Sequence, residues 1–149
     1  MQNVVIGFLG TQLDMGRKRK WRPSIHLCAH EHFPVTRLEL LYDERFLRLA
    51  EGVRQDIAPL APQTEVMLRR LDLADPWDFE EVYGALFDFA EGYQFDEDRE
   101  RYHVHLTTGT HVAQICWFLL TESLMRCLPG AMPAALAPLV HLEGEAGRG

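Results

Sequence analysis

The sequence predicts an α/β protein built on a Rossmann-like, doubly wound, mostly parallel sheet with helices on both faces. One observation is a continuous apolar, β-branched run at residues 4–9, typical of a strand buried on both faces. A second is that strand patterns alternate with helical patterns along the chain, which favours right-handed crossovers and a parallel sheet. A third is the length of 149 residues, which suits one domain with a substantial core.

Each element is expected from its own local pattern. Strand character is found in residues 4–9, 34–42, 64–71 and 102–106. Helical spacing of apolar residues, or a helix-start signal, is found in residues 23–30, 44–58, 75–93 and 110–122. The third strand has a charged second face, which favours an edge of the sheet. Asp75 is a suitable N-cap and Pro76 a suitable first residue, so we expect the third helix to begin there.

The character of the chain changes after residue 128. Residues 1–128 carry the regular pattern and are assigned to the folded domain. Residues 129–149 are rich in proline, glycine and alanine, which predicts an irregular C-terminal segment, with a candidate fifth strand near 139–142. The fourth helix, by contrast, is apolar over most of its circumference, so we expect it to be buried in this domain or against a partner subunit.

Composition narrows the functional classes. The formal net charge of −7 argues against non-specific nucleic-acid binding over the whole surface, although five of the 15 basic residues lie within positions 17–22. No apolar stretch is long enough to span a membrane, and the N-terminus lacks the features of a signal peptide. The three cysteines have no metal-like spacing, so we expect a reduced, cytoplasmic protein without a structural metal.

The junction after the fourth strand is the main candidate binding site. An apolar strand runs directly into a helix, which leaves the first N–H groups of that helix free for an anion. Threonine hydroxyls, a glycine that permits close approach and a histidine on the first turn add to it. These residues are Thr107, Thr108, Gly109, Thr110 and His111, with Gln114 one turn further on. The alternative interpretation is an ordinary helix cap at Thr110.

A second junction, after the first strand, is built in a similar way. It carries Thr11, Asp14, Trp21 and Arg22. Ligands of open α/β sheets bind outside the carboxyl ends of the strands, so the two junctions meet at one crevice if the first and fourth strands are neighbours. Arg22 and the hydroxyls suit phosphate, Trp21 suits a base, and Asp14 suits a ribose hydroxyl. The alternative for Trp21 is an ordinary core residue.

Several standard motifs are absent. Neither the dinucleotide-binding glycine pattern nor the phosphate-binding loop of nucleotide triphosphatases occurs, so we expect no cofactor. His30-Glu31-His32 lacks a third ligand and favours a surface loop over a metal site. His103 and His105 share a strand face, which is more typical of a core pair than of a metal or base site. No catalytic residues are assigned.

Four segments together resemble a known family. They are VIGFLGTQLD (residues 5–14), KWRPS (20–24), DPWDFEEVY (75–83) and HLTTGTHVAQIC (105–116). They resemble the N-terminal sensor domain of the RtcR family, which are sigma-54-dependent transcriptional activators of the bacterial RNA-repair operon. The resemblance covers about residues 3–128 and implies a CARF domain, the CRISPR-associated Rossmann fold.

The resemblance also implies a function. CARF domains are usually homodimers that bind a ligand such as a cyclic oligonucleotide across the dimer axis, near the loops after the first and fourth strands. In the RNA-repair activators, the domain is expected to sense an RNA end that carries a 2′,3′-cyclic phosphate and to control an adjacent AAA+ domain. Residues 129–149 would then lead toward that domain, which this chain lacks.

Two other functions remain open at this stage. Some CARF domains are ring nucleases that cleave cyclic oligoadenylate without a metal, and Thr110, His111 and Arg22 suit that geometry electrostatically. Nothing in the sequence forms an evident nucleophile-base pair, so we expect a sensor and not an enzyme. The other alternative is a purely structural dimerisation module, which the apolar fourth helix would serve equally well.

Overall fold

The computed structural model describes residues 1–11, 14–15 and 22–127. Strands and helices alternate along the chain, as the sequence predicts. The elements are β1 (Gln2–Phe8), α1 (Pro23–Cys28), β2 (Arg37–Tyr42), the short 3-10 helix η1 (Glu44–Phe46), α2 (Leu47–Leu60), β3 (Glu65–Arg70), α3 (Phe79–Gly92), β4 (Glu100–His105) and α4 (His111–Cys127). The segment 139–142, a candidate fifth strand, lies outside the described residues.

The strands form one parallel sheet in the order β3-β2-β1-β4. This order confirms that β3 lies at an edge and that β1 and β4 are neighbours. The register places Val5 beside His103 of β4 and beside Leu38 of β2. The chain therefore reverses its direction of winding at β1. Because the strands are parallel, the loops after β1 and β4 both lie at the carboxyl ends of the strands.

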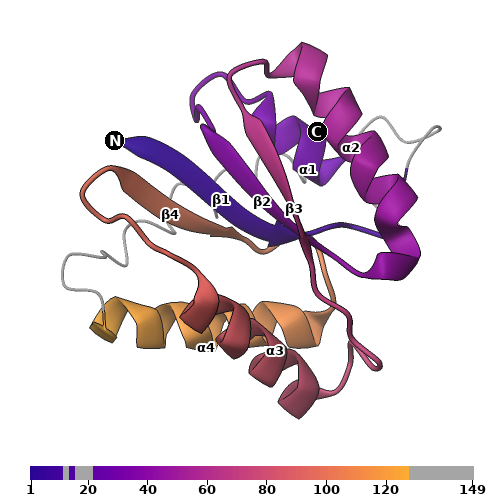
Figure 1. The fold of residues 1–149 in the computed structure, drawn as a ribbon, viewed down its shortest axis with the longest axis vertical. Helices are drawn as coiled ribbons and strands as arrows, with labels where there is room; N and C mark the ends of the chain where they lie inside the picture. Colours follow the sequence, from indigo (N-terminus) through magenta and orange to yellow (C-terminus); the bar gives the residue numbers. More distant parts are fainter. Residues whose placement is uncertain (12–13, 16–21, 128–149) are drawn as a thin grey trace.

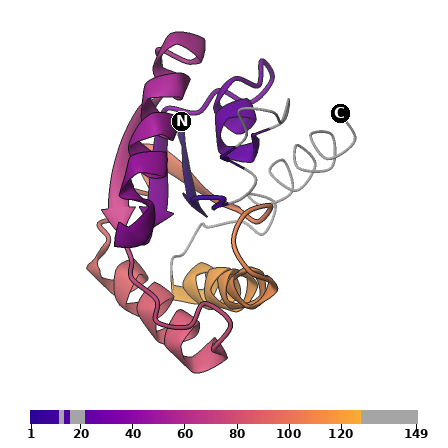
Figure 2. The same ribbon diagram turned by 90° about the vertical axis from the view of Figure 1, so that its right-hand side faces the viewer.

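Helices cover both faces of the sheet. Figures 1 and 2 show α1 and α2 on one face and α3 and α4 on the other. Because side chains alternate along a strand, β1 serves both cores. Val5 packs with α1 and α2, whereas Ile6 and Phe8 pack with α3 and α4. This is the doubly wound arrangement that the sequence predicts, with one hydrophobic core on each face.

The start of α3 differs from the sequence prediction. The helix begins at Phe79, and its N-cap is Asp78, whose carboxylate accepts the N–H of Glu80 at 3.1 Å. Asp75 instead closes a turn ahead of the helix, where its carboxylate accepts the N–H of Trp77 at 3.0 Å. The prediction of Asp75 as N-cap was therefore wrong, because two aspartates three residues apart compete for the same role and the local pattern does not separate them.

The sequence predicts that α4 is buried over most of its circumference, but in the described residues only one side of the helix is buried. Ala113, Cys116, Trp117 and Leu120 are buried against the sheet and α3. Ile115, Phe118 and Leu119 lie on the outer side, and Phe118 is 60% exposed. The described part of α4 thus presents an apolar stripe outward. No helix among the described residues is long and apolar enough to cross a membrane.

Candidate functional site

A cavity of about 550 Å³ lies at the carboxyl ends of the strands, where the sheet topology predicts a ligand site. Segments that follow all four strands contribute to it. It is lined by Phe8, Leu9, Gly10, Thr11, Leu41, Tyr42, Asp43, Arg45, Phe46, Leu71, Leu73, Pro76, Trp77, Gly109, Thr110, His111 and Ala113. Most of these are apolar, and the polar side chains lie at the ends of the strands or in the segments that follow them. That combination is typical of a pocket for a small molecule or part of a larger one.

The loop between β4 and α4 forms one wall. Gly109 has φ +90°, in the left-handed region, and a side chain there would press against Phe8. Thr110 caps α4, because its hydroxyl oxygen accepts the N–H of Ala113 at 3.1 Å. The same hydroxyl donates to the carbonyl of Pro76 at 2.8 Å. Thr110 is thus both the helix cap and a cavity residue, so the two interpretations of this junction are compatible.

The loop after β1 forms the adjoining wall through Gly10 and Thr11, of which Thr11 is exposed. Asp14 lies behind this wall and is 0% exposed. Its carboxylate accepts the N–H of Gly10 at 2.7 Å, and it also accepts the hydroxyl of Ser24 at 2.7 Å and the N–H of Ser24 at 3.0 Å. These bonds give Asp14 a structural role in the loop, in place of the expected contact with a ribose.

Arg22 is also engaged away from the cavity. Its Nε donates to the carbonyl of Asp14 at 2.7 Å, and its Nη1 pairs with Asp56 of α2 at 2.7 Å. Arg22 is not among the residues that line the cavity, so the expected phosphate contact has no support in this geometry. Trp21, which was expected to contact a base, lies outside the described residues.

Three further candidates from the loop after β4 and from α4 are not among the residues that line the cavity. They are Thr107, Thr108 and Gln114. Thr108 is buried, and its Oγ1 has no hydrogen-bond partner within the described part of the chain. The structure therefore brings Thr11, Gly109, Thr110 and His111 to one cavity, whereas Asp14, Arg22, Thr107, Thr108 and Gln114 do not line it.

Sequence reasoning missed the contributions that follow β2 and β3. Trp77 lines the cavity, is 60% exposed and lies with its ring centroid 6.3 Å from that of His111. After β2, Arg45 pairs with Asp43, with Nε 3.0 Å from Oδ1, and this hydrogen bond holds the pKa of Asp43 down at about 2. The rule that ligands bind beyond the carboxyl ends of strands would have flagged both segments.

The two strand histidines are core residues, as expected. His103 is 1% exposed, packs its ring edge-on to Phe33 with centroids 4.9 Å apart, and has its Nε2 3.3 Å from Oδ1 of Asn3. His105 is buried against Gly7, where an added Cβ would lie 2.8 Å from the Cβ of His105. Across the described residues, no three His, Cys, Asp or Glu side chains gather into a metal-binding group.

Burial of His105 predicts a pH-dependent stability. Burial lowers the pKa of His105 to about 4, whereas an unfolded histidine has a pKa of about 6.5. As pH falls from 6.5 toward 4, His105 becomes protonated in the unfolded state but stays neutral in the folded state. We therefore expect the free energy of unfolding to fall in this window by at most about 1.4 kcal/mol per pH unit.

Urea unfolding at pH 7, 5.5 and 4.5 measures this effect. The variant His105→Gln should show a shallower loss of stability over this range than the original chain. His32→Gln, which changes an exposed histidine, is the matched control and should keep the original slope. An unchanged slope in His105→Gln would assign the acid sensitivity to other groups.

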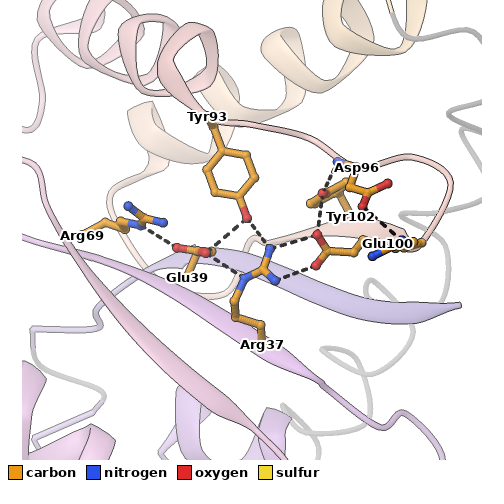
Figure 3. Close-up of polar contacts among 8 residues, drawn as sticks. Arg37, Glu39, Arg69, Tyr93, Asp96, Glu100 and Tyr102 are labelled. Atoms are coloured by element: carbon orange, nitrogen blue, oxygen red, sulfur yellow. Dashed lines mark hydrogen bonds and ion pairs between the residues drawn. The ribbon is translucent and has the colours of Figure 1, made fainter.

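A separate ionic cluster lies on the α3 and α4 side of the sheet and shares no residue with the cavity lining (Figure 3). Glu39 is at its centre and is 1% exposed. Its carboxylate accepts Nε of Arg37 at 2.9 Å and Nε of Arg69 at 2.7 Å. Arg37 also bonds to Glu100 at 2.6 Å, across β1, and to the hydroxyl of Tyr93 at 2.7 Å. The cluster therefore ties β2, β3 and β4 to the end of α3.

Comparison with known proteins places the chain among regulators. A family model described as RtcR, regulator of RNA terminal phosphate cyclase, matches residues 1–145. The transcriptional regulatory protein RtcR of Escherichia coli (strain K12) is 49% identical over 142 residues. That match covers 92% of this chain and 26% of the relative, so the chain spans about a quarter of the length of the Escherichia coli regulator.

Two solved structures of CARF-domain proteins have the same fold. One is Csm6 of Enterococcus italicus bound to cyclic hexa-2′-fluoro-hexa-dAMP, with a TM-score of 0.68 and 11% identity over 83% of this chain and 31% of that one. The other is Can2 of Sulfobacillus thermosulfidooxidans in complex with cyclic tetra-adenylate, with a TM-score of 0.56 and 15% identity over 82% of this chain and 30% of that one. At such low identity the likeness shows the CARF-type Rossmann fold alone.

Proposed function

Because the chain belongs to the RtcR family of regulators of RNA terminal phosphate cyclase, we propose that it is the ligand-sensing regulatory domain of a transcriptional activator of RNA repair. In this proposal, the domain binds an RNA end that carries a 2′,3′-cyclic phosphate, or another oligonucleotide signal. The bound ligand then controls an adjacent AAA+ domain by favouring one of two arrangements of the protein.

The observation that carries the proposal is the cavity at the carboxyl ends of all four strands. Its walls combine an apolar interior with Thr11 in the loop after β1 and with Thr110 and His111 at the start of α4. Thr11 follows β1, and the other two groups follow β4; these are the neighbouring strands at which the winding reverses. The related folds of Csm6 and Can2 were solved with cyclic oligonucleotides, which supports an oligonucleotide as the ligand class.

Direct binding tests the proposal. We would titrate the chain with an RNA that ends in a 2′,3′-cyclic phosphate, with the same RNA ending in a 3′-hydroxyl, and with cyclic tetra-adenylate, over a salt series. The proposal expects one of these ligands to bind with a preference that survives moderate salt. Equal and strongly salt-dependent binding of both RNAs would indicate backbone attraction only. Binding of none of the three would reject the proposal.

A matched pair of variants locates the site. His111→Ala removes an exposed side chain of the cavity wall, so we expect weaker binding with unchanged stability. Gln114→Ala removes a neighbouring side chain that does not line the cavity and should have a smaller effect. Equal affinity of His111→Ala and the original chain would move the site elsewhere.

The domain is proposed to act without catalysis. Arg22, one of the three residues that would assist cleavage electrostatically, is engaged by Asp14 and Asp56 and does not line the cavity. Incubation with cyclic tetra-adenylate, followed by chromatography, should leave the ligand intact. Linear products would instead support the ring nuclease alternative. The open cavity also favours a sensor over a purely structural dimerisation module.

The outer stripe of α4 supports a homodimer as part of this proposal. His111, Ile115, Phe118, Leu119 and Glu122 follow helical spacing along the exposed side. If two copies pack their α4 helices antiparallel about a two-fold axis, the apolar residues meet in the middle. Each Glu122 carboxylate then lies near the partner's imidazole at the other end of the stripe. The stripe is therefore self-complementary in both apolar surface and hydrogen-bonding groups.

Substitution within this stripe is expected to produce a monomer. Phe118→Glu places a charge in the centre of the proposed interface, where it would lack a partner. Sedimentation should show about twice the chain mass of 17.1 kDa for the original protein and a single chain for the variant. Phe87→Glu, on the exposed side of α3, is the matched control and should remain dimeric. A monomeric original chain would contradict the homodimer.

A further inference from the structure

Trp77 is an exposed aromatic side chain held on a rigid support. It is 60% exposed, although its indole lines the cavity and approaches the ring of His111. Single exposed aromatic side chains are common on soluble proteins, so exposure alone gives Trp77 no role. Trp77 differs from the other exposed aromatic side chains of the described chain because it also lines the cavity.

The loop that carries Trp77 is fixed from three sides. The N–H of Trp77 donates to the carboxylate of Asp75 at 3.0 Å, and the N–H of Asp75 donates to Glu81 of α3 at 3.1 Å. The carbonyl of Pro76 accepts the hydroxyl of Thr110 at the start of α4. The backbone that carries the indole is therefore held in place before any ligand arrives, which reduces the entropy lost on binding.

The cavity behind Trp77 is suited to a planar, mostly apolar group. Its inner surface includes Phe8, Leu41 and Leu73, and its volume of about 550 Å³ accommodates a nucleotide. Arg45 is the arginine in the lining, and its charge is balanced by its pair with Asp43. The interior thus offers little net positive charge for a phosphate, whereas an aromatic wall offers a favourable surface to a base.

We propose that Trp77 is a ligand-contacting residue that stacks on a nucleobase of the bound oligonucleotide, which in an RNA end is the terminal base. This proposal rests on the proposed function and adds which chemical group enters the cavity. Base-aromatic stacking has a known size by alanine substitution, which predicts that Trp77→Ala weakens binding by about 5-fold to 150-fold. A phenyl ring keeps part of the stacking surface, so Trp77→Phe should retain an intermediate affinity.

The test separates recognition of the base from recognition of the phosphate. We would measure binding of two RNAs with the same 2′,3′-cyclic phosphate end, one with adenine on the terminal nucleotide and one abasic there, together with cyclic tetra-adenylate. The original chain should prefer the RNA with the base, and Trp77→Ala should lose that preference. Phe79→Ala, which removes an exposed ring two residues further on that does not line the cavity, is the matched control and should keep it. Thermal unfolding of each variant checks that the fold is retained.

The outcomes distinguish the two proposals. If the original chain binds both RNAs equally well and Trp77→Ala changes neither affinity, stacking by Trp77 is overturned and the sensor function stands. If Trp77→Ala lowers both affinities by the same factor, Trp77 supports the wall and does not read the base, which also overturns the inference. If the original chain binds none of the three ligands, the proposed function and this inference both fail.

Discussion

Replacing Glu39 by alanine is expected to lower the free energy of unfolding by about 3 kcal/mol, the low end of the range for breaking a buried ion pair. The carboxylate is almost completely buried and accepts hydrogen bonds from Arg37, Arg69 and Tyr93. Burial raises the pKa of Tyr93 to about 12, so its hydroxyl stays protonated and donates to Glu39. Both arginines retain contact with water, which limits the cost of losing their shared partner.

Chemical denaturation of three variants checks this expectation. Glu39→Gln keeps the shape of the side chain but removes its charge. Its free energy of unfolding should therefore lie between that of the original chain and that of Glu39→Ala. Glu65→Ala, at an exposed position of β3, is the matched control and should change stability by less than about 0.5 kcal/mol. A loss below 1 kcal/mol for Glu39→Ala would mean that water replaces the carboxylate. Since the cluster lies outside the cavity, the folded variant should keep its ligand affinity.

The fold was predictable because its signals are local. The apolar run of β1 requires cover on both faces, and the alternation of strand and helix leaves few topologies that provide it. The structure confirms the parallel sheet, the neighbouring β1 and β4 and the edge position of β3. The start of α3 was not predictable, because Asp75 and Asp78 are equivalent as caps until the fold places Glu81 against the backbone of Asp75.

The site was predictable only in part. Thr11, Gly109, Thr110 and His111 reach the cavity because β1 and β4 are neighbours in the doubly wound order that the sequence predicts, which brings their loops together at the carboxyl ends of the strands. The role of Arg22 was not predictable, because it depends on Asp56, 34 positions away in the sequence. A side chain's partner in space decides whether it faces a ligand or supports a wall, and no local pattern contains that information.

The second large effect is expected at Asp14. Asp14→Ala leaves the N–H of Gly10 and both donors of Ser24 without their acceptor in a buried position. Hydrogen bonds to a charged group contribute about 1.5–3 kcal/mol each and are not additive, so we expect a total loss of about 3–4 kcal/mol in the free energy of unfolding. Because Gly10 lies in the cavity wall, the ligand affinity should fall as well.

Stability and affinity together show which role Asp14 has. A supporting residue affects both, whereas a residue that contacts only the ligand affects affinity alone. Thr11→Ala is the matched control, since Thr11 is exposed in the same loop and should change affinity with little change in stability. Ser24→Ala removes one of the three donors and should cost about 1 kcal/mol. If Asp14→Ala weakens binding but unfolds at the same denaturant concentration as the original chain, Asp14 contacts the ligand, and the wall does not depend on its hydrogen bonds.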